Sequence, residues 1–159
     1  MTGPEEMISE ASLEQMPAVR DLFIEYQQWL GIDLCFQGFD QELAALPGCY
    51  APPRGAVLLA THRNRLSGCV AFRALSETQA ELKRLYVKPE CRGAGLGRAL
   101  FNAAMDRVRA LGYQSIVLDT LPGMNTAQCM YRTYGFIEVP PYNTSPVEGV
   151  QYYRFEFSD

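Results

Sequence analysis

The sequence of 159 residues has few of the patterns that mark metal sites, disulfide frameworks or membrane spans. Its single histidine, His62, has no ligand-type residue near it at metal-binding spacing, so no metal site is predicted. The five cysteines include no Cys-x-x-Cys pair, and their odd count favours reduced thiols. No apolar run approaches the length of a membrane-spanning helix, so no membrane partner is expected.

The N-terminal segment also lacks an export signal. Residues 1–15 are acidic and contain no apolar signal core, which predicts a cytoplasmic protein. Low-complexity segments and internal repeats are absent, and a composition of 48% apolar and 20% charged residues is that of an ordinary globular protein. The length suits one domain that spans residues 1–159.

A long basic surface is missing as well. The net charge is −4, and the positive charge is concentrated in residues 83–98, where five cations stand against Glu90. Nucleic acid would need a basic face over a long footprint, so it is excluded as a partner. Residues 1–50 are strongly acidic, with nine carboxylates against Arg20.

Hydrophobic periodicity and turn residues predict a mixed α/β domain. Helices are expected over residues 12–30, 39–46, 95–111 and 125–134, the first opened by a capping box at Ser12-Leu13-Glu14-Gln15. Strands are expected over residues 7–9, 56–63, 66–75, 79–87, 113–120, 137–139 and 150–157, with a turn at Asn64-Arg65.

The stretch Arg92-Gly93-Ala94-Gly95-Leu96-Gly97 lies between a predicted strand and a predicted helix. Glycines let the backbone approach an anion closely, and the unpaired amides of a first helical turn point at it, so the stretch predicts a phosphate-binding loop. The dinucleotide fingerprint does not fit, because Arg98 stands where that pattern needs glycine. A Walker A loop does not fit either, because no Gly-Lys-Ser/Thr follows. A tight loop without a ligand is the remaining alternative.

The Arg-x-x-Gly-x-Gly pattern resembles the pyrophosphate loop of the GNAT superfamily of acyl-CoA N-acyltransferases. The order of the flanking motifs agrees with this resemblance over residues 80–140: the strand Leu82-Lys83-Arg84-Leu85-Tyr86-Val87, the strand Ser115-Ile116-Val117-Leu118-Asp119, and the helix end Tyr131-Arg132-Thr133-Tyr134-Gly135-Phe136. A weaker likeness at Cys35–Asp40 and Pro140-Pro141-Tyr142 suggests a bacterial subgroup. The resemblance implies one domain with a mixed, mostly antiparallel sheet flanked by helices.

The resemblance also implies acetyl-CoA as acyl donor and assigns a set of residues to it. The glycine loop would bind the diphosphate, and the backbone of the preceding strand would bind the pantetheine arm and the reacting carbonyl. The cofactor-binding residues expected on this basis are Leu85, Tyr86, Val87, Arg92, Gly93, Ala94, Gly95, Leu96, Gly97, Arg98 and Asn125.

Two catalytic residues are predicted by the same resemblance. Tyr131, four residues before Gly135, would protonate the leaving thiolate, with a packed core tyrosine as the alternative. Tyr134 lies beside the helix stop and is better explained by packing. Glu81 lies where histone-modifying members of the superfamily carry a catalytic glutamate, so it would act as general base. The alternative for Glu81 is a solvated strand-end charge paired with Lys83.

Together these features predict an N-acetyltransferase that acts on a primary amine of a small molecule or peptide by direct attack in a ternary complex. Cys129 and Tyr131 should point to different faces of their helix, which argues against a cysteine relay. The alternative is a non-catalytic acyl-CoA-binding sensor or interaction module, and a homodimer is left open.

The resemblance also implies that the amine acceptor binds between residues 33–40 and 142–147. The acidic bias of residues 1–50 favours a cationic amine there, against the alternative of a solvated acidic helix face.

Overall fold

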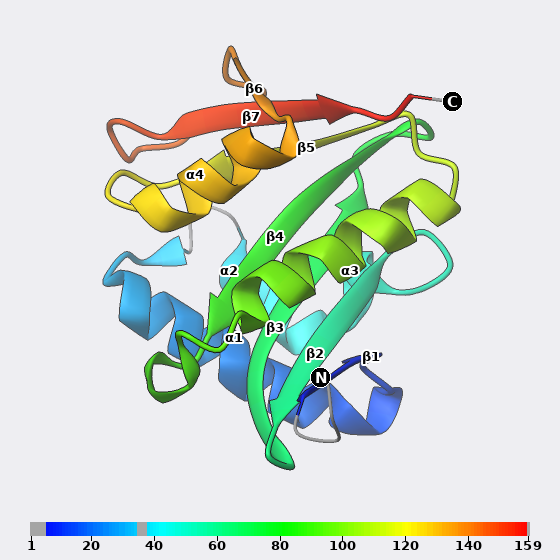
Figure 1. Ribbon diagram of the computed structural model, residues 1–159, viewed down its shortest axis with the longest axis vertical. Helices are drawn as coiled ribbons and strands as arrows, with labels where there is room; N and C mark the ends of the chain where they lie inside the picture. Colours follow the sequence, from blue (N-terminus) through cyan, green and yellow to red (C-terminus); the bar gives the residue numbers. More distant parts are fainter. Residues whose placement is uncertain (1–5, 35–37, 159) are drawn as a thin grey trace.

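A computed structural model describes residues 6–34 and 38–158 of the chain (Figure 1). Within these residues the strands form a seven-stranded sheet in the order β1-β2-β3-β4-β5-β7-β6. Neighbouring strands are antiparallel except for β4 and β5, which are parallel. The predicted mixed, mostly antiparallel sheet is therefore confirmed.

The strands are β1 Glu6–Glu10, β2 Ala56–His62, β3 Arg65–Ala74, β4 Gln79–Val87, β5 Ser115–Thr120, β6 Ile137–Val139 and β7 Gln151–Glu156. The α-helices are α1 Met16–Leu30, α2 Phe39–Ala45, α3 Leu96–Ala110 and α4 Asn125–Tyr134. Short 3-10 helices lie at Leu13–Gln15, Gly48–Tyr50 and Pro89–Cys91. Each predicted element is present, with ends that differ by a few residues.

Two of these differences lie at the start of α1 and at the turn between β2 and β3. The capping box at Ser12 is present, and the Ser12 amide donates to Gln15 Oε1 at 2.9 Å, but the first turn is a 3-10 helix and α1 begins only at Met16. The turn predicted at Asn64-Arg65 is wrong by one residue. Arg63 and Asn64 adopt the left-handed φ angles of 52° and 63°, so Arg65 already pairs with His62.

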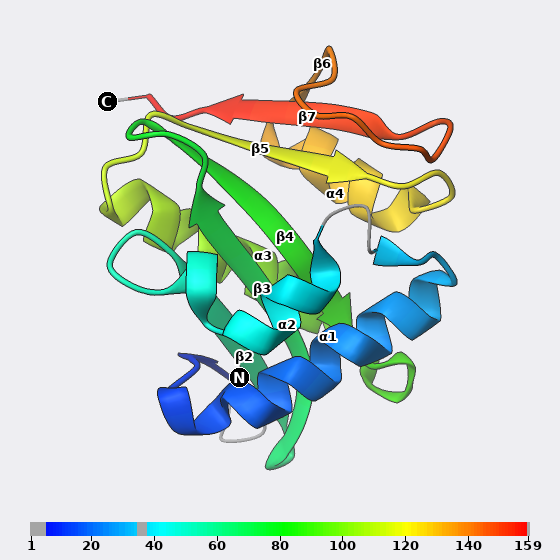
Figure 2. The same cartoon turned by 180° about the vertical axis from the view of Figure 1, so that it is seen from behind.

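Helices cover both faces of the sheet. Helices α3 and α4 lie on one face (Figure 1), and α1 and α2 lie on the other (Figure 2). Strand residues alternate between the two cores, so Leu58 packs on the α3 side whereas Leu59 packs on the α1 side. Within the described residues, no helix is both long enough and apolar enough to span a bilayer.

The parallel pair β4–β5 is short, and this creates the main opening in the fold. The two strands pair only where Gln79, Ala80 and Glu81 face Ser115, Ile116 and Val117. Beyond that point they diverge (Figure 1), so the later part of β4 has no β5 partner in the described structure. Main-chain groups on this edge of β4 are consequently available to a ligand.

A β-bulge bends β4 next to this opening. Cys69 pairs with Tyr86 and Ala71 with Lys83, so Arg84 and Leu85 of β4 together oppose Val70 of β3, one extra residue on β4. Arg84 takes a left-handed φ of 62° in the bulge. On the neighbouring strand, Gly68 allows the close approach of β4, because a Cβ at this position would lie 2.6 Å from the carbonyl oxygen of Tyr86.

Replacing Gly68 with alanine should therefore destabilise the protein. The new methyl group would meet the Tyr86 carbonyl oxygen and would also lie 3.1 Å from Leu100 Cδ1. We expect a loss of about 1–3 kcal/mol in the free energy of unfolding, as for other overpacked sites, measured by urea denaturation.

The matched control is Gly97→Ala, where the new Cβ would make only an ordinary contact of 3.8 Å with Val87 Cγ2 at the start of α3. This variant should be as stable as the original protein or slightly more stable, because alanine is the better helix former. Equal unfolding midpoints for the two variants would contradict the close-approach argument.

Candidate functional site

The glycine loop has the geometry of an anion site. Gly93 and Gly95 take φ angles of 91° and 79°, and a Cβ at either position would extend into open space. Gly95 is the N-cap of α3, and the first helical bond runs from the Ala99 amide to the Gly95 carbonyl at 3.0 Å. The amides of the first turn therefore have no intrahelical acceptor and no side-chain cap. These features fit a diphosphate.

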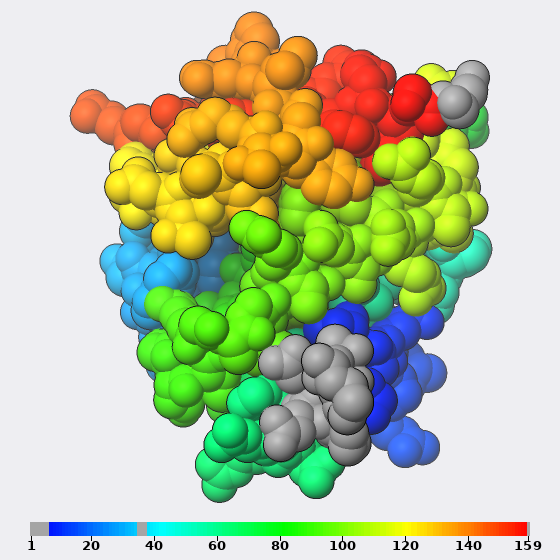
Figure 3. Space-filling view, in the orientation of Figure 1, coloured from blue at the N-terminus to red at the C-terminus, as the bar shows by residue number. Residues whose placement is uncertain are grey.

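A groove with a volume of about 1060 Å³ extends from this loop. In Figure 3 the surface is hollowed between the yellow segment that contains α4 and the green segment that leads into α3. With the exception of Ala94, all the predicted cofactor-binding residues line the groove: Leu85, Tyr86, Val87, Arg92, Gly93, Gly95, Leu96, Gly97, Arg98 and Asn125.

Trp29 of α1 also lines the groove and was not predicted from the sequence. The Arg92 guanidinium lies 4.4 Å from the centre of the Trp29 ring, and Arg92 Nε donates to the Val87 carbonyl at 3.0 Å. These two contacts hold a cation beside the glycine loop. Helical periodicity gave no signal that Trp29 lines a ligand groove.

The positive charge at the loop is smaller than the sequence suggested. Among the five cations of residues 83–98, Arg92 and Arg98 line the groove. Lys88 forms an ion pair with Glu25 at 3.4 Å, and Lys83 and Arg84 line a different cavity. The predicted concentration of five cations around the phosphate loop is therefore wrong, because Lys83 and Arg84 face the second cavity and Lys88 is paired with Glu25.

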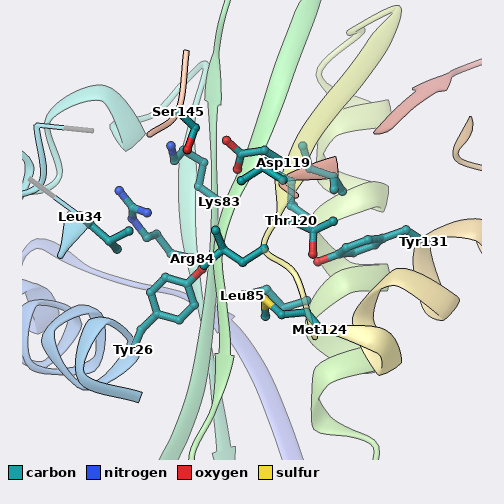
Figure 4. A pocket seen from close by; sticks show the side chains of 14 residues that line it. Tyr26, Leu34, Lys83, Arg84, Leu85, Asp119, Thr120, Met124, Tyr131 and Ser145 are labelled. Carbon is teal, nitrogen blue, oxygen red and sulfur yellow. The ribbon is translucent and has the colours of Figure 1, made fainter. Parts of the chain in front are cut away.

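A second, smaller cavity of about 40 Å³ lies in the opening between β4 and β5 (Figure 4). Its charged lining residues are Lys83, Arg84 and Asp119. Leu85, Met124 and Tyr131 line both this cavity and the groove, so the two spaces meet at these three side chains. The other lining residues are Tyr26, Leu34, Leu82, Leu118, Thr120, Leu121, Ser145 and Val150.

Tyr131 lies at the junction of the two spaces. Its side chain is buried and its ring centre is 5.5 Å from that of Phe101, so the tyrosine is packed and also borders both cavities. Burial raises the pKa of Tyr131 above its ordinary value, so the hydroxyl keeps its proton at neutral pH. Tyr134 packs against Phe101 and Phe155, as predicted.

Thr120, at the end of β5, lines the second cavity together with Tyr131 (Figure 4). Thr120 Oγ1 is buried and has no hydrogen-bond partner in the described part of the chain. A buried polar group of this kind is costly unless a ligand or water satisfies it. Thr120 was not predicted from the sequence, because a threonine at the end of a strand is common.

Glu81 is buried between two partners. Its Oε1 accepts from Arg73 Nε at 2.9 Å, and its Oε2 accepts from the Tyr142 hydroxyl at 2.6 Å. The alternative of a solvated charge paired with Lys83 is therefore wrong. Glu81 is also absent from the lining of both cavities. The hydrogen bond from Tyr142 instead ties the segment before β7 to the sheet.

Arg84 and Glu42 form a buried ion pair beside the second cavity. Arg84 Nε and Nη2 each donate to Glu42 at 2.9 Å, and the Tyr50 hydroxyl donates to Glu42 Oε1 at 3.0 Å. Burial alone would lower the pKa of Arg84, but the hydrogen bonds to Glu42 raise it above its ordinary value. The guanidinium therefore stays charged, and its charge is balanced within the protein.

The acidic N-terminal third contributes uncharged side chains, not carboxylates, to the walls of these cavities. Its lining residues are Tyr26, Trp29 and Leu34, and no carboxylate from the described part of residues 1–50 is among them. The charge argument for a cationic acceptor is therefore unsupported. Of the predicted acceptor segments, residues 35–37 lie outside the described structure, and Ser145 of the second segment lines the smaller cavity.

Among the residues that the structure describes, no group of three or more His, Cys, Asp or Glu side chains could hold a metal ion. Cys129 is exposed and lines the groove, whereas Tyr131 is buried at its inner end.

The fold, the glycine loop and the two joined cavities agree with the predicted acyltransferase class, and comparison with known proteins gives the family. Residues 16–136 match the acetyltransferase (GNAT) family model, so the chain belongs to this family. Family membership confirms the predicted enzyme class, an acyltransferase that uses acetyl-CoA as donor.

Curated relatives and solved structures agree with this assignment. An uncharacterized N-acetyltransferase of Schizosaccharomyces pombe is 41% identical and covers 84% of this chain and 83% of its own length. One from Dictyostelium discoideum is 28% identical and covers 84% and 90%. The structure of PaiA N-acetyltransferase from Thermoplasma acidophilum in complex with coenzyme A has a TM-score of 0.74 at 19% identity, over 96% and 99% of the two chains. Because the first two relatives are eukaryotic, the bacterial subgroup is not confirmed.

The Arg84–Glu42 pair gives a stability prediction. Glu42→Gln removes the carboxylate and leaves a buried guanidinium without its counter-charge, so we expect a loss of about 3–5 kcal/mol in the free energy of unfolding. Glu25→Gln is the matched control, because the Glu25–Lys88 pair is partly exposed to solvent and should contribute at most about 1 kcal/mol. Chemical denaturation of both variants measures the difference, and similar losses would refute the role given to burial.

Proposed function

We propose that residues 1–159 act as one N-acetyltransferase domain that transfers an acetyl group from acetyl-CoA to a primary amine of a small molecule or peptide by direct attack in a ternary complex. The observation that carries the proposal is the meeting of two spaces at Tyr131: a long groove from the glycine loop and a polar cavity between β4 and β5. Each space would hold one substrate.

The groove supports binding of the donor. The α3 amides and the cations Arg92 and Arg98 would hold the diphosphate, and Asn125 at the start of α4 lies on the opposite wall. The unpaired edge of β4 at Leu85, Tyr86 and Val87 offers main-chain donors and acceptors to an extended amide chain. The solved coenzyme A complex of PaiA N-acetyltransferase has the same fold and supports this role for the groove.

Acetyl-CoA supplies an acyl group activated as a thioester. In the transfer, a C–N bond forms, the C–S bond breaks, the amine loses one proton, and the sulfur gains one. The Tyr131 hydroxyl is protonated at neutral pH and would donate to the sulfur. Main-chain amides of the β4 edge would stabilise the oxyanion, since they are fixed before charge develops.

A base is required because an amine with a pKa near 10.4 is neutral in only about one molecule in 10³ to 10⁴ at pH 7. Glu81 stays the predicted base, and it would have to act through water because it is not in the lining of either cavity. Its contacts with Arg73 and Tyr142 support a positioning role for the segment before β7.

The non-catalytic sensor is the weaker alternative. A module that only detects acyl-CoA has no use for a second polar cavity at the inner end of the groove or for a buried, protonated tyrosine between the two spaces. The predicted homodimer and the peptide acceptor stay predictions.

Tyr131→Phe tests the catalytic acid. We expect kcat to fall by about 10²- to 10³-fold, because the proton donor is lost, while the Kd for acetyl-CoA from calorimetry changes by less than about threefold. In the unmodified protein, ionisation of Tyr131 should not reduce kcat below about pH 10, since its pKa is raised.

Tyr134→Phe is the matched control on the same helix. Its ring packs against Phe101 and Phe155, so removal of the hydroxyl should leave kcat within about threefold. Equal kcat values for the two variants would remove Tyr131 from the mechanism. Binding of acetyl-CoA without turnover across a broad amine panel would favour the sensor.

Glu81→Gln separates a base from a positioning residue. If Glu81 positions Tyr142, KM for the acceptor should rise by about tenfold while kcat and the shape of its pH profile are kept. If Glu81 is the base, kcat should fall by about 10²- to 10⁴-fold and the low-pH inflection should disappear. Tyr142→Phe should reproduce the KM effect only in the first case, because it breaks the same hydrogen bond.

A further inference from the structure

The cavity between β4 and β5 carries opposite charges on its two strands. Lys83 and Arg84 enter from β4 and Asp119 enters from β5. A cavity for a simple cationic amine would need only negative charge. The presence of both charges instead favours an acceptor that carries a cationic and an anionic group. This inference rests on the proposed function, because it takes the cavity as the acceptor site.

The charge of Arg84 is balanced by Glu42, which accepts two hydrogen bonds from it. The other cationic lining residue is Lys83. Burial is the main cause that lowers the pKa of Lys83, and the neighbouring Arg84 lowers it further, while Glu81 and Asp119 act in the opposite direction. An anionic group of a ligand beside Lys83 would offset this burial cost.

Asp119 is held in place by the segment before β7. Asn143 Nδ2 donates to Asp119 Oδ2 at 3.1 Å, and Asn143 Oδ1 accepts from the Tyr152 hydroxyl at 2.8 Å. The carboxylate is therefore oriented at the cavity wall, where it can accept from an ammonium or amine group.

The charged groups are ordered along the cavity. In Figure 4 Tyr131 and Thr120 lie on one side, Lys83 and Ser145 lie toward the other, and Asp119 lies between them. The acyl group must arrive at the Tyr131 side, where the groove joins the cavity. An amine placed for attack would then lie near Thr120 and Asp119, and a substituent of the amine would point toward Lys83 and Ser145.

We propose that the acceptor is a compact zwitterionic amine of the amino-acid type, with its amine nitrogen at Asp119 and Thr120 and its carboxylate at Lys83 and Ser145. The unsatisfied Thr120 hydroxyl supplies an independent sign of a polar ligand at the amine position. A volume of about 40 Å³ is only a few times that required by one water, so it suits a compact group. A polyamine would place its second cation beside Lys83, which is unfavourable.

The transfer balances for this acceptor. The amino acid enters as a zwitterion, and its ammonium group gives up one proton to the base and so to solvent before attack. The nitrogen loses a second proton as the C–N bond forms and the C–S bond breaks, the sulfur receives one proton, and the N-acetyl amino acid leaves with its carboxylate intact. No oxidant or reductant is required.

Matched acceptor pairs test the proposal in the unmodified protein. Each compact amino acid is compared with its decarboxylated amine and its carboxamide, with spermidine and a lysine peptide as cationic acceptors, and kcat/KM is measured with saturating acetyl-CoA. We expect the amino acids to exceed their decarboxylated and amide partners by about 10- to 100-fold, the range of one charge-assisted hydrogen bond. Equal or higher kcat/KM for the decarboxylated amines or spermidine would overturn the zwitterion proposal while leaving acetyl transfer intact.

Variants of the charged lining residues test which side chains cause the preference for amino acids. Lys83→Met should reduce kcat/KM for the amino acids by about 10- to 100-fold and change that for the decarboxylated amines by less than about threefold, whereas Lys83→Arg should keep most of the preference. Asp119→Asn should weaken both kinds of acceptor. Arg65→Met, at the exposed start of β3, is the charge-matched control and should change nothing.

Calorimetry with acetyl-CoA distinguishes a defect in the acceptor cavity from loss of the donor site. A Kd for the donor that stays within about threefold shows that each variant is folded and that the groove is intact. Equal losses for all acceptors in Lys83→Met would overturn the carboxylate site, because they would indicate a structural or proton-transfer role. No binding of acetyl-CoA to the unmodified protein would overturn the proposed function and this inference together.

Discussion

The separation of β4 from β5 beyond the Glu81–Val117 pair is the constraint on which the site depends. Parallel strands normally continue to pair as far as their lengths allow, because each unpaired main-chain group carries a cost. Here the bulge at Arg84 and Leu85 turns β4 away from β5, and the Arg84–Glu42 pair fixes the bulge from the α2 side. The open edge is therefore maintained by an ion pair that belongs to the core rather than to either substrate.

The segment before β7 contacts the same opening through hydrogen bonds to both strands. Tyr142 donates to Glu81, the last residue of β4 that pairs with β5, and Asn143 donates to Asp119 on β5. One short segment is thus attached to both strands where they part. Because Asn143 contacts Asp119 and Ser145 of the same segment lines the cavity, the position of this segment shapes the cavity wall.

The glycine loop, the strands beside it and Tyr131 could be predicted from the sequence because their signals are local. A glycine N-cap, a β-branched strand and a Tyr-x-x-x-Gly-Phe helix end each occupy a few consecutive residues. The cavity between β4 and β5 could not be predicted in this way. Lys83, Asp119 and Ser145 come from three separate elements, and Glu42 balances Arg84 across about 40 positions of sequence. The count of carboxylates in residues 1–50 gave an unsupported expectation of a cationic acceptor for the same reason, because folding decides which charges are neutralised by a partner.

The burial of Tyr131 bears directly on how it can act as an acid. Burial raises its pKa, and a phenol of raised pKa is a poor donor to a thiolate, whose pKa near 8.5 in water is lower. The same desolvation acts on the sulfur, because a thiolate that forms at the junction is an anion away from water and becomes a stronger base. The difference between the two pKa values, rather than either value alone, decides the transfer. A junction of low polarity lined by Leu85 and Met124 is therefore compatible with Tyr131 as both a packed core residue and the proposed proton donor.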